Sequence, residues 1–258
     1  MIPIKTPQEI KIMEKGAKIL AKALFEVLQY AKPGVSELEL DLLAEELITK
    51  QGGEPGFKKV EGYKHTICIS TNDVVVHGIP TDYRLKEGDI VGIDCGVFLE
   101  GFHTDMSETV RISNIQYPIS NIQNDKVDEF LDTGEKALEL AIHQVRPGNR
   151  IGHISKTIQM IVEGGGYSVV RELIGHGVGR ELHEDPEVPG YLSGKIDNTP
   201  LLKEGMVIAV EIIYNMGRKE VVYSGKDDWT IKTKDGSLSG LFERTVAVTK
   251  EGHRILTL

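Results

Sequence analysis

The sequence predicts an α+β domain in which helices cover a mainly antiparallel sheet and two halves share one plan. The motif Leu-Lys-Glu-Gly precedes an apolar stretch twice, first at Leu85 and again 117 residues later at Leu202. In each half, a long helical pattern, a Lys-Pro-Gly or Arg-Pro-Gly stop, a shorter helical pattern and a glycine run also follow in the same order. We therefore expect one domain, 1–258, built from pseudo-two-fold duplicated halves near 1–110 and 125–250.

Composition narrows the class of protein. The chain has 258 residues, 40% of them hydrophobic, which is enough for one large core. The net charge of −9 without a basic block argues against nucleic-acid binding by a charged surface. Cys68 and Cys95 form no CxxC pair and are expected to be reduced thiols. Without a signal-peptide pattern or an apolar run of about 18 residues, we expect a cytoplasmic monomer that does not enter a membrane.

Local patterns place the elements of the first half. Thr6 and Ser36 each begin a capping box, and apolar residues at helical spacing follow both. In chain order, the predicted elements are a helix at Thr6–Tyr30, a helix from Ser36 to Gly52, short strands at Thr66–Ser70 and Val74–His77, and a hairpin of Ile90–Val97 and Phe102–Val110.

The second half follows the same plan after a polar connection at Asn114–Asn124. In chain order, we expect a helix from Val127 to Val145, a shorter helix at Ile151–Val162, a strand at Tyr167–Ile174, a proline-containing loop at Asp185–Pro200, and strands at Met206–Tyr214, Val221–Tyr223 and Phe242–Thr249.

The predicted hairpin carries two acidic residues, Asp94 and Asp105. If the loop at its turn has an even number of residues, both carboxylates lie on the same face of the pair, because side chains alternate between faces. Two carboxylates in an apolar sheet repel each other, and buried charge is tolerated when it is paired or bound to a metal. The hairpin therefore predicts a cation site.

Further candidate ligands lie in the second half. The 117-residue offset carries Asp94 onto Glu211, which stands in the apolar run MVIAVEII. Glu243 stands in a similar run, and His176 and His183 lie in the glycine-rich segment GHGVGRELHE. Simpler interpretations are a buried ion pair for Glu211, a pair with the neighbouring Arg244 for Glu243, and a phosphate loop for the glycines. The phosphate loop is disfavoured because such a loop needs a helix that begins directly after the glycines, and the residues that follow these glycines are a poor helix start.

Together these candidates are four carboxylates and one imidazole. Such an oxygen-rich set of ligands favours Mn, Fe(II) or Co(II), and it is unlike a structural zinc site with thiolate ligands. Two metal ions that share bridging carboxylates, roughly 3.5–4 Å apart, would make the most economical use of them.

At this point the sequence resembles the methionine aminopeptidases, most closely the bacterial type I form, whose fold is called pita-bread. The resemblance covers essentially the whole chain and is carried by VVHGIP at 75–80, GIDCGV at 92–97, GHGVGRELHE at 175–184 and DDWTIKTKDGSLSGLFE at 227–243. It implies a metal-dependent aminopeptidase for N-terminal methionine excision from nascent polypeptides. It also implies two divalent ions (Co, Mn, Fe or Zn) and leaves a contact with the ribosome open.

The resemblance further implies a role for each candidate. The metal ligands would be Asp94 on one ion, Asp105 and Glu243 as bridges, and His176 and Glu211 on the other ion. Glu211 would also shuttle a proton for a water activated between the two metals. His183 would hydrogen-bond the scissile carbonyl, and His77 would contact the amide on the leaving side. The apolar pocket for methionine would include Tyr63, Cys68, Leu182 and Trp229, and a monovalent cation would lie near Asn72, Val74 and Ser239.

Some positions depart from the family pattern without removing a ligand. They are Ile212 in place of proline, Arg244 in place of histidine, Gly240-Leu241 in place of Ala-Gln, and Leu182 and Val60 in place of aromatic residues. If Arg244 folded toward the site, it would weaken metal binding. Two alternatives remain: a related exopeptidase of X-Pro specificity, and a non-catalytic binding module on the same fold. The second is disfavoured because all five ligands are present.

Overall fold

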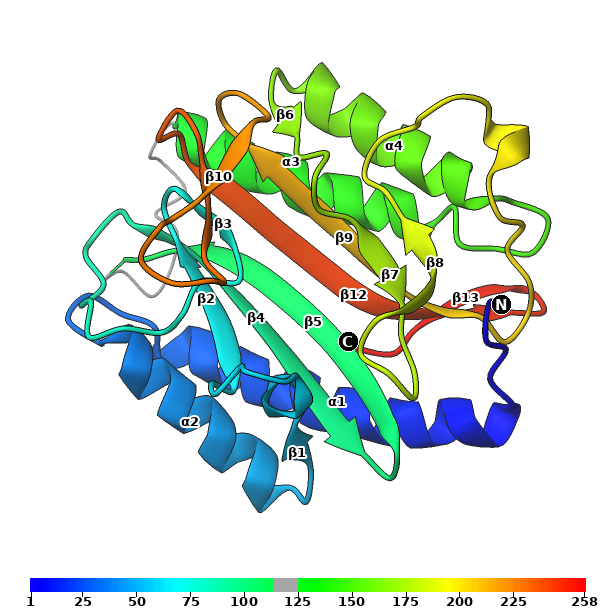
Figure 1. The fold of residues 1–258 in the computed structure, drawn as a ribbon, viewed down its shortest axis with the longest axis horizontal. Helices are drawn as coiled ribbons and strands as arrows, with labels where there is room; N and C mark the ends of the chain where they lie inside the picture. Colours follow the sequence, from blue (N-terminus) through cyan, green and yellow to red (C-terminus); the bar gives the residue numbers. More distant parts are fainter. Residues whose placement is uncertain (114–124) are drawn as a thin grey trace.

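The computed structural model describes residues 1–113 and 125–258, so the predicted connection Asn114–Asn124 lies outside the described residues. A large antiparallel sheet crosses the molecule, and long helices pack against one of its faces (Figure 1). The helices are α1 (Pro7–Tyr30), α2 (Glu37–Lys50), α3 (Lys126–Ile142) and α4 (Ile151–Gly164), with 3₁₀ turns at Phe57–Lys59 and Ile196–Asn198. The strands are β1 (Glu54–Pro55), β2 (Ile67–Thr71), β3 (Val74–Val76), β4 (Ile90–Leu99), β5 (Phe102–Arg111), β6 (Ser168–Val169), β7 (Gly175–Gly177), β8 (Glu184–Val188), β9 (Val207–Asn215), β10 (Val221–Tyr223), β11 (Ile231–Thr233), β12 (Ser239–Thr249) and β13 (Gly252–Ile255).

The strand order of the large sheet relates the two halves of the chain. The order is β1-β4-β5-β12-β9-β7-β8, so the β4–β5 hairpin of the first half lies beside the β12–β9 pair of the second. Counted outward from the β5–β12 seam, β4 and β9 occupy matching places. The 117-residue offset therefore carries Asp94 on β4 to Glu211 on the matching strand.

Alternation along the strands gives the sheet two different faces. On β4, Val91, Ile93 and Cys95 point toward a cluster that includes Leu20 and Leu24 of α1. On β9 and β12, the even-numbered apolar residues pack with α3 and α4 in a second cluster. Because successive side chains on a strand point to opposite faces, Asp94, Glu211 and Glu243 lie on the face turned away from these helices.

Most predicted elements are confirmed. Thr6 and Ser36 cap α1 and α2 with complete capping boxes, in which the glutamate three residues later bonds back to the cap. The turn between β4 and β5 consists of Glu100 and Gly101, an even loop, as the shared face of Asp94 and Asp105 requires.

Two predicted elements are wrong. The strand predicted at Tyr167–Ile174 is reduced to β6, because only Ser168 and Val169 pair with β9 before the chain turns toward β7. The loop predicted at Asp185–Pro200 begins instead as β8, which pairs with β7. Pro186 argued against a strand there, but β8 is an outer strand of the sheet, where a missing backbone N–H is tolerated.

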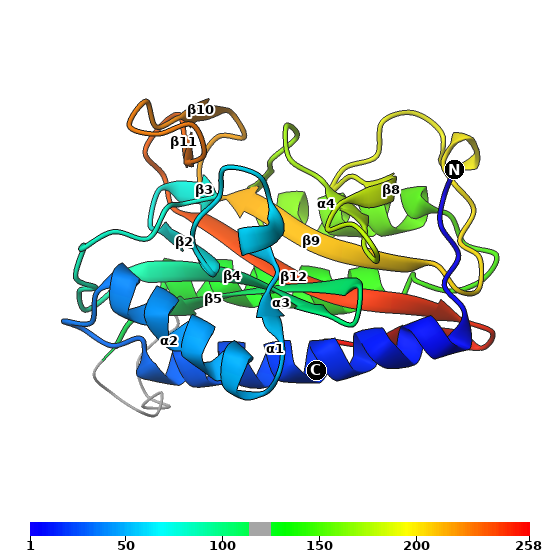
Figure 2. The ribbon, with the colours of Figure 1, turned by 60° about the horizontal axis from the view of Figure 1, so that its bottom comes forward.

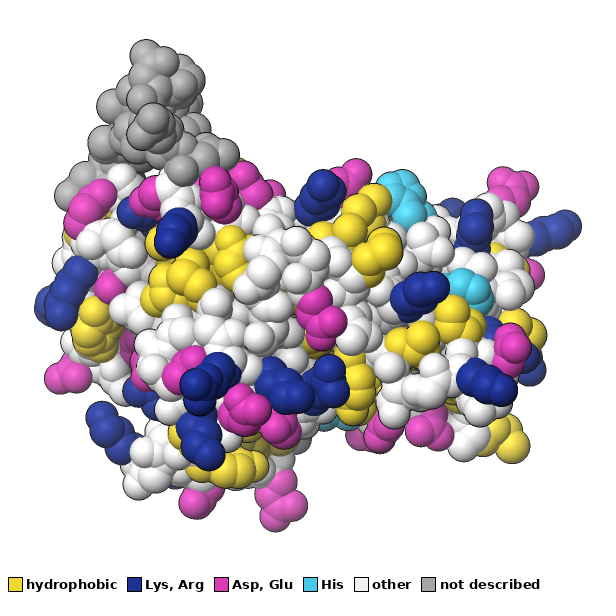
Figure 3. Space-filling model, turned by 90° about the horizontal axis from the view of Figure 1, so that it is seen from above, with side chains coloured by type: hydrophobic (Ala, Val, Ile, Leu, Met, Phe, Trp, Pro, Cys, Tyr) yellow, Lys and Arg dark blue, Asp and Glu magenta, His cyan; other side chains and the backbone are white. Residues whose placement is uncertain are grey.

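A small sheet, ordered β10-β11-β3, rises from the sheet face opposite α1 (Figure 2). In the same view β8, the outer strand of the large sheet, also lies on the upper side, so segments from both halves surround this face. On the face drawn in Figure 3, basic and acidic side chains are interspersed rather than gathered into one basic patch. Within residues 1–113 and 125–258, we find no helix whose length and apolar character would let it cross a bilayer.

The contact between α3 and the sheet offers a test of the fold. A Cβ on Gly134 would lie 2.4 Å from both Phe242 Cε2 and the Tyr214 hydroxyl, and both of these side chains are fully buried. We expect Gly134→Ala to lower the free energy of unfolding by about 1–3 kcal/mol through overpacking. Thermal unfolding measures this. Gly164→Ala on α4, where a Cβ meets nothing within 4 Å, is the control and should keep or slightly raise stability. Equal melting temperatures for the two variants would contradict the packing described.

Candidate active site

Acidic side chains form a row across the centre of the sheet. The strand register places Asp94 opposite Ser107, Ser107 opposite Glu243, and Glu243 opposite Glu211. The row thus runs through β4, β5, β12 and β9 on one face. Asp105 lies two residues before Ser107 and shares this face. Folding therefore brings together all four carboxylates that the sequence predicted as metal ligands.

His176 joins the row from β7, which lies next to β9. Its Nε2 lies 3.4 Å from Glu211 Oε1, and its Nδ1 lies 2.8 Å from the carbonyl oxygen of Gly177. If Nδ1–H donates to that carbonyl, the lone pair of Nε2 is left facing the carboxylates, as a metal-binding imidazole requires. One ligand atom each from Asp105, His176 and Glu243 lie within 4.8 Å of one another.

The electrostatics of the row suit a bound cation. Burial raises the pKa of Asp94 to about 7. Burial and then the neighbouring carboxylates hold the pKa values of Asp105, Glu211 and Glu243 well above their usual range. Asp94 Oδ1 and Glu243 Oε1 are buried and have no hydrogen-bond partner among the described residues. A divalent cation fits this cluster, because it would satisfy both oxygens and offset the repulsion.

Burial also makes His176 suitable as a metal ligand. It lowers the pKa of His176 to about 4, so the ring is neutral near pH 7 and can offer a nitrogen lone pair. The nearby His183 adds to this effect, since the two ring centroids are 4.3 Å apart.

The row forms part of the wall of a cavity of about 180 Å³, which also contains the predicted pocket residues. Tyr63 and Trp229 meet edge to face with centroids 5.1 Å apart, and Cys68 and Leu182 belong to the same buried cluster. Phe57, which no sequence pattern predicted as a pocket residue, belongs to the same wall. No local signal marks it, because it lies in a glycine-rich loop and reaches the site through its packing with Tyr63.

His77 and His183 line the same cavity from opposite halves of the chain. His77 has a left-handed backbone with φ of 56°, which is uncommon for a residue with a side chain. The next residue must be glycine, since a Cβ on Gly78 would lie 1.9 Å from the carbonyl oxygen of Ile69. Burial, followed by the charge of His183, lowers the pKa of His77 to about 4.

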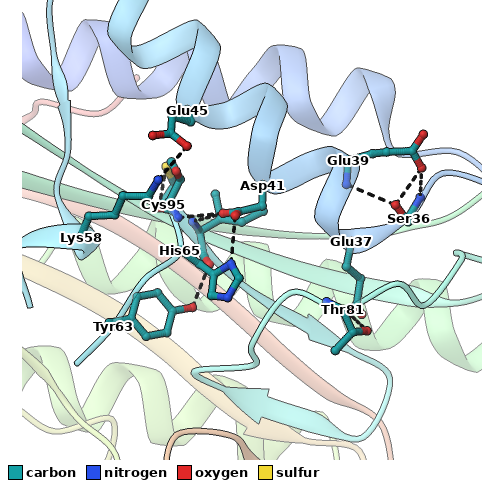
Figure 4. A network of polar contacts seen from close by, with 12 residues as sticks. Ser36, Glu37, Glu39, Asp41, Glu45, Lys58, Tyr63, His65, Thr81 and Cys95 are labelled. Atoms are coloured by element: carbon teal, nitrogen blue, oxygen red, sulfur yellow. Dashed lines mark hydrogen bonds and ion pairs between the residues drawn. The ribbon is translucent and has the colours of Figure 1, made fainter.

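A polar network behind the cavity fixes the loop that carries Tyr63 (Figure 4). Asp41 on α2 accepts hydrogen bonds from the backbone N–H groups of Thr66 and Ile67, and its other oxygen lies 3.0 Å from His65 Nδ1. The Tyr63 hydroxyl donates to the carbonyl oxygen of Ile67 at 2.8 Å. These contacts fix the start of β2, where Cys68 pairs with Asp94.

The structure also defines the positions of the residues expected near a monovalent cation and of Arg244. Asn72 and Ser239 are adjacent, because the Ser239 N–H donates to the Asn72 carbonyl at 2.9 Å, while Val74 pairs with Lys232 on β11. Arg244 points to the helix face, where its Nη2 lies 2.5 Å from Glu108 Oε2. The hypothesis that Arg244 folds toward the carboxylates is therefore wrong, since neighbouring residues of a strand point to opposite faces.

The fold and this buried cluster define a metallohydrolase, and comparisons with known proteins specify the class. The model of metallopeptidase family M24 matches residues 11–250. A methionine aminopeptidase from Clostridium perfringens is 43% identical over 258 residues, which cover 100% of this chain and 99% of that protein. Methionine aminopeptidase 1 from Bacillus subtilis is 43% identical over 257 residues, with coverage of 100% and 99%.

A solved structure agrees with these relatives. The crystal structure of methionine aminopeptidase from Thermotoga maritima matches with a TM-score of 0.92 at 39% sequence identity, covering 100% of this chain and 99% of that one. The chain therefore belongs to metallopeptidase family M24 and, within it, to the methionine aminopeptidases, which share the pita-bread fold.

The raised carboxylate pKa values predict how the metal-free protein responds to pH. A carboxylate whose pKa is higher in the folded than in the unfolded state contributes stability at low pH, and this contribution is lost as pH rises through the folded pKa. Between pH 6.5 and 8, we expect the melting temperature of the chelated protein to fall as pH rises, because Asp94, with a folded pKa of about 7, and the three carboxylates with raised pKa values keep protons that the unfolded chain has already lost. Thermal unfolding in EDTA measures this, and Asp94→Asn should reduce the loss. A melting temperature that rises over this interval would contradict the assignment.

Proposed function

We propose that this protein removes the N-terminal methionine from polypeptides by hydrolysis, with metal ions held by the acidic row. One observation carries the proposal. Among the residues that the structure describes, two buried carboxylate oxygens that line a largely apolar cavity have no hydrogen-bond partner. The chain around this cavity aligns over its full length with methionine aminopeptidases.

The donor arrangement supports two divalent ions. The residues that would hold them are Asp94, Asp105, His176, Glu211 and Glu243. Oxygen-rich ligands with one imidazole suit Mn, Fe(II) or Co(II), and Zn is also compatible. When bound, such ions polarise a carbonyl and lower the pKa of water toward about 7.

Other steps of the proposed reaction depend on residues of the chain. Glu211, whose pKa is raised by burial and by Asp94, would accept a proton at a carboxylate oxygen and return it to the leaving amine. His183 would donate a hydrogen bond to the scissile carbonyl oxygen as negative charge develops there. His77 would contact the amide on the leaving side. Both histidines line the cavity close to the row, as these roles require.

The cavity wall supports a preference for methionine. Tyr63, Cys68, Leu182 and Trp229 present an apolar surface with two aromatic rings, and thioether sulfur makes favourable contacts with aromatic edges. A volume of about 180 Å³ suits one side chain rather than a longer segment. In this proposal Phe57 completes the wall beside Tyr63.

Several further expectations belong to the same proposal. We expect the chain to act as one catalytic domain, 1–258, with duplicated halves near 1–110 and 125–250, and to work as a cytoplasmic monomer on nascent chains. A transient contact with the ribosome would fit that substrate. The adjacent Asn72 and Ser239, with Val74 nearby, would hold a monovalent cation through backbone oxygens.

Peptide hydrolysis tests the proposed function directly. We expect the metal-free protein to be inactive, and activity on a Met-Ala-Ser peptide to appear on addition of Mn(II), Fe(II) or Co(II). Release of methionine is measured by chromatography. Leu-Ala-Ser and Ala-Pro-Ala peptides are the controls, the second of which tests the X-Pro alternative. A folded protein that binds metal but releases no methionine would contradict the proposal.

His183→Ala tests the carbonyl contact. Loss of one donor to a developing oxyanion costs about 10²–10³-fold in kcat, so a decrease of that size is expected with little change in metal content. His143→Ala, a change at an exposed cap residue of α3, is the matched control and should leave kcat unchanged. If both variants retained full kcat, His183 would have no role in the reaction.

A further inference from the structure

The seam between the two halves of the sheet is paired unlike the strands on either side of it. Backbone register extends along the whole of β4–β5 and most of β12–β9. Between β5 and β12 it is limited to Ser107 with Glu243 and Met106 with Arg244. Two of the proposed metal ligands, Asp105 and Glu243, lie on the two strands of this seam.

At one end of this short pairing, a threonine hydroxyl makes the hydrogen bonds to the neighbouring strand that the backbone of its own strand would otherwise make. Thr245 Oγ1 accepts a hydrogen bond from the Asp105 N–H at 2.9 Å and donates to the Asp105 carbonyl at 2.7 Å. The backbone of Thr245 is engaged elsewhere. Its N–H donates to Thr257 Oγ1 at 3.0 Å, and its carbonyl accepts from Leu256 at 2.9 Å. The C-terminal segment thus occupies the edge of β12 at this residue.

The other end of the pairing repeats the arrangement with the strands exchanged. Thr109 on β5 donates from Oγ1 to the Leu241 carbonyl at 2.7 Å and accepts from the Leu241 N–H at 2.9 Å. Thr109 faces Leu241 across the seam in the same way as Thr245 faces Asp105. A pseudo-two-fold axis therefore relates the two links. Both threonines are buried, at 2% and 0% exposure.

Each link fixes one backbone at a set distance from its neighbour. A hydroxyl that satisfies both the N–H and the C=O of one residue holds the two peptide groups on either side of that residue without a direct strand pair. Its removal leaves two buried polar groups unsatisfied. Asp105 is held in this way, and its carboxylate shares the 4.8 Å cluster with His176 and Glu243. Leu241 is held in the same way, and it lines the cavity.

We propose that Thr245 is a positioning residue for the metal cluster, and that Thr109 is its counterpart for the substrate cavity. Thr245 fixes the backbone of Asp105 so that the carboxylate reaches the ion shared with Glu243. Thr109 fixes Leu241 and with it one wall of the cavity. The inference rests on the proposed function for the identity of the metal cluster and the substrate.

Valine has the shape of threonine without the hydroxyl, so Thr245→Val and Thr109→Val form a matched pair. We expect Thr245→Val to weaken Mn(II) binding to the full-length chelated protein by about 10–100-fold, the usual effect of losing a group that orients a ligand. Thr245→Ser, which keeps the hydroxyl, should bind within about threefold of the unaltered protein. Isothermal titration calorimetry measures all of these affinities.

Thr109→Val separates local positioning from a general weakening of the sheet. Its Mn(II) affinity should equal that of the unaltered protein, while its KM for Met-Ala-Ser rises several-fold. Circular dichroism and thermal unfolding confirm that each variant is folded. If Thr245→Val does not fold, Thr245→Ala replaces it, with the same expected loss of affinity.

Two results would overturn the inference. One is Mn(II) affinity of Thr245→Val equal to that of the unaltered protein. The other is an equal loss of affinity in Thr245→Val and Thr109→Val, which would show that the seam supports the sheet as a whole. Because calorimetry needs no turnover, failure of the proposed function is visible separately: the unaltered protein would then bind Mn(II) without releasing methionine.

Discussion

Four carboxylates buried side by side in one sheet repel one another, and this repulsion shapes the structure around them. Asp94, Asp105, Glu211 and Glu243 all have raised pKa values because burial disfavours their charged forms and most of them also face one another. Such a cluster opposes folding unless a cation offsets it. The opposite face of the same strands, where α1 and α3 cover aliphatic side chains, supplies stability that the acidic face does not.

How much of this site the sequence predicts depends on how far apart in the sequence the interacting residues lie. Asp94 and Asp105 belong to one hairpin, so period-two alternation and an even turn were enough to place them on one face. Glu211 followed from the repeat. The β5–β12 register could not be predicted, because Ser107 and Glu243 are 136 residues apart in sequence and only the assembled sheet aligns them. Ser107 itself was overlooked, although it shares the alternation of Asp105.

The four carboxylates proposed as metal ligands follow the two-fold plan more closely than the histidines of the site do. Each carboxylate lies on a strand with a counterpart in the other half, whereas His176 and His183 come from β7 and the turn after it, and His77 from the end of β3. A symmetric cation site has no preferred direction for a peptide. In the proposed function, the unequal histidines and the apolar wall at Tyr63 and Trp229 would give the cavity a methionine side and a leaving side.

Arg244 shows why separating the two faces matters. It is adjacent in sequence to Glu243, yet its guanidinium pairs with Glu108 on the helix face and also donates to the carbonyl of Ser107 at 3.1 Å. A cation so close to a metal ligand would compete with the metal if it shared the ligand's face. On the opposite face it instead ties β5 to β12 at the level of the acidic row. Arg244 therefore links the two strands at the centre of the seam from the helix face, and threonine hydroxyls link them at its two ends. Both kinds of contact allow two strands with little direct pairing to present Asp105 and Glu243 at a fixed separation.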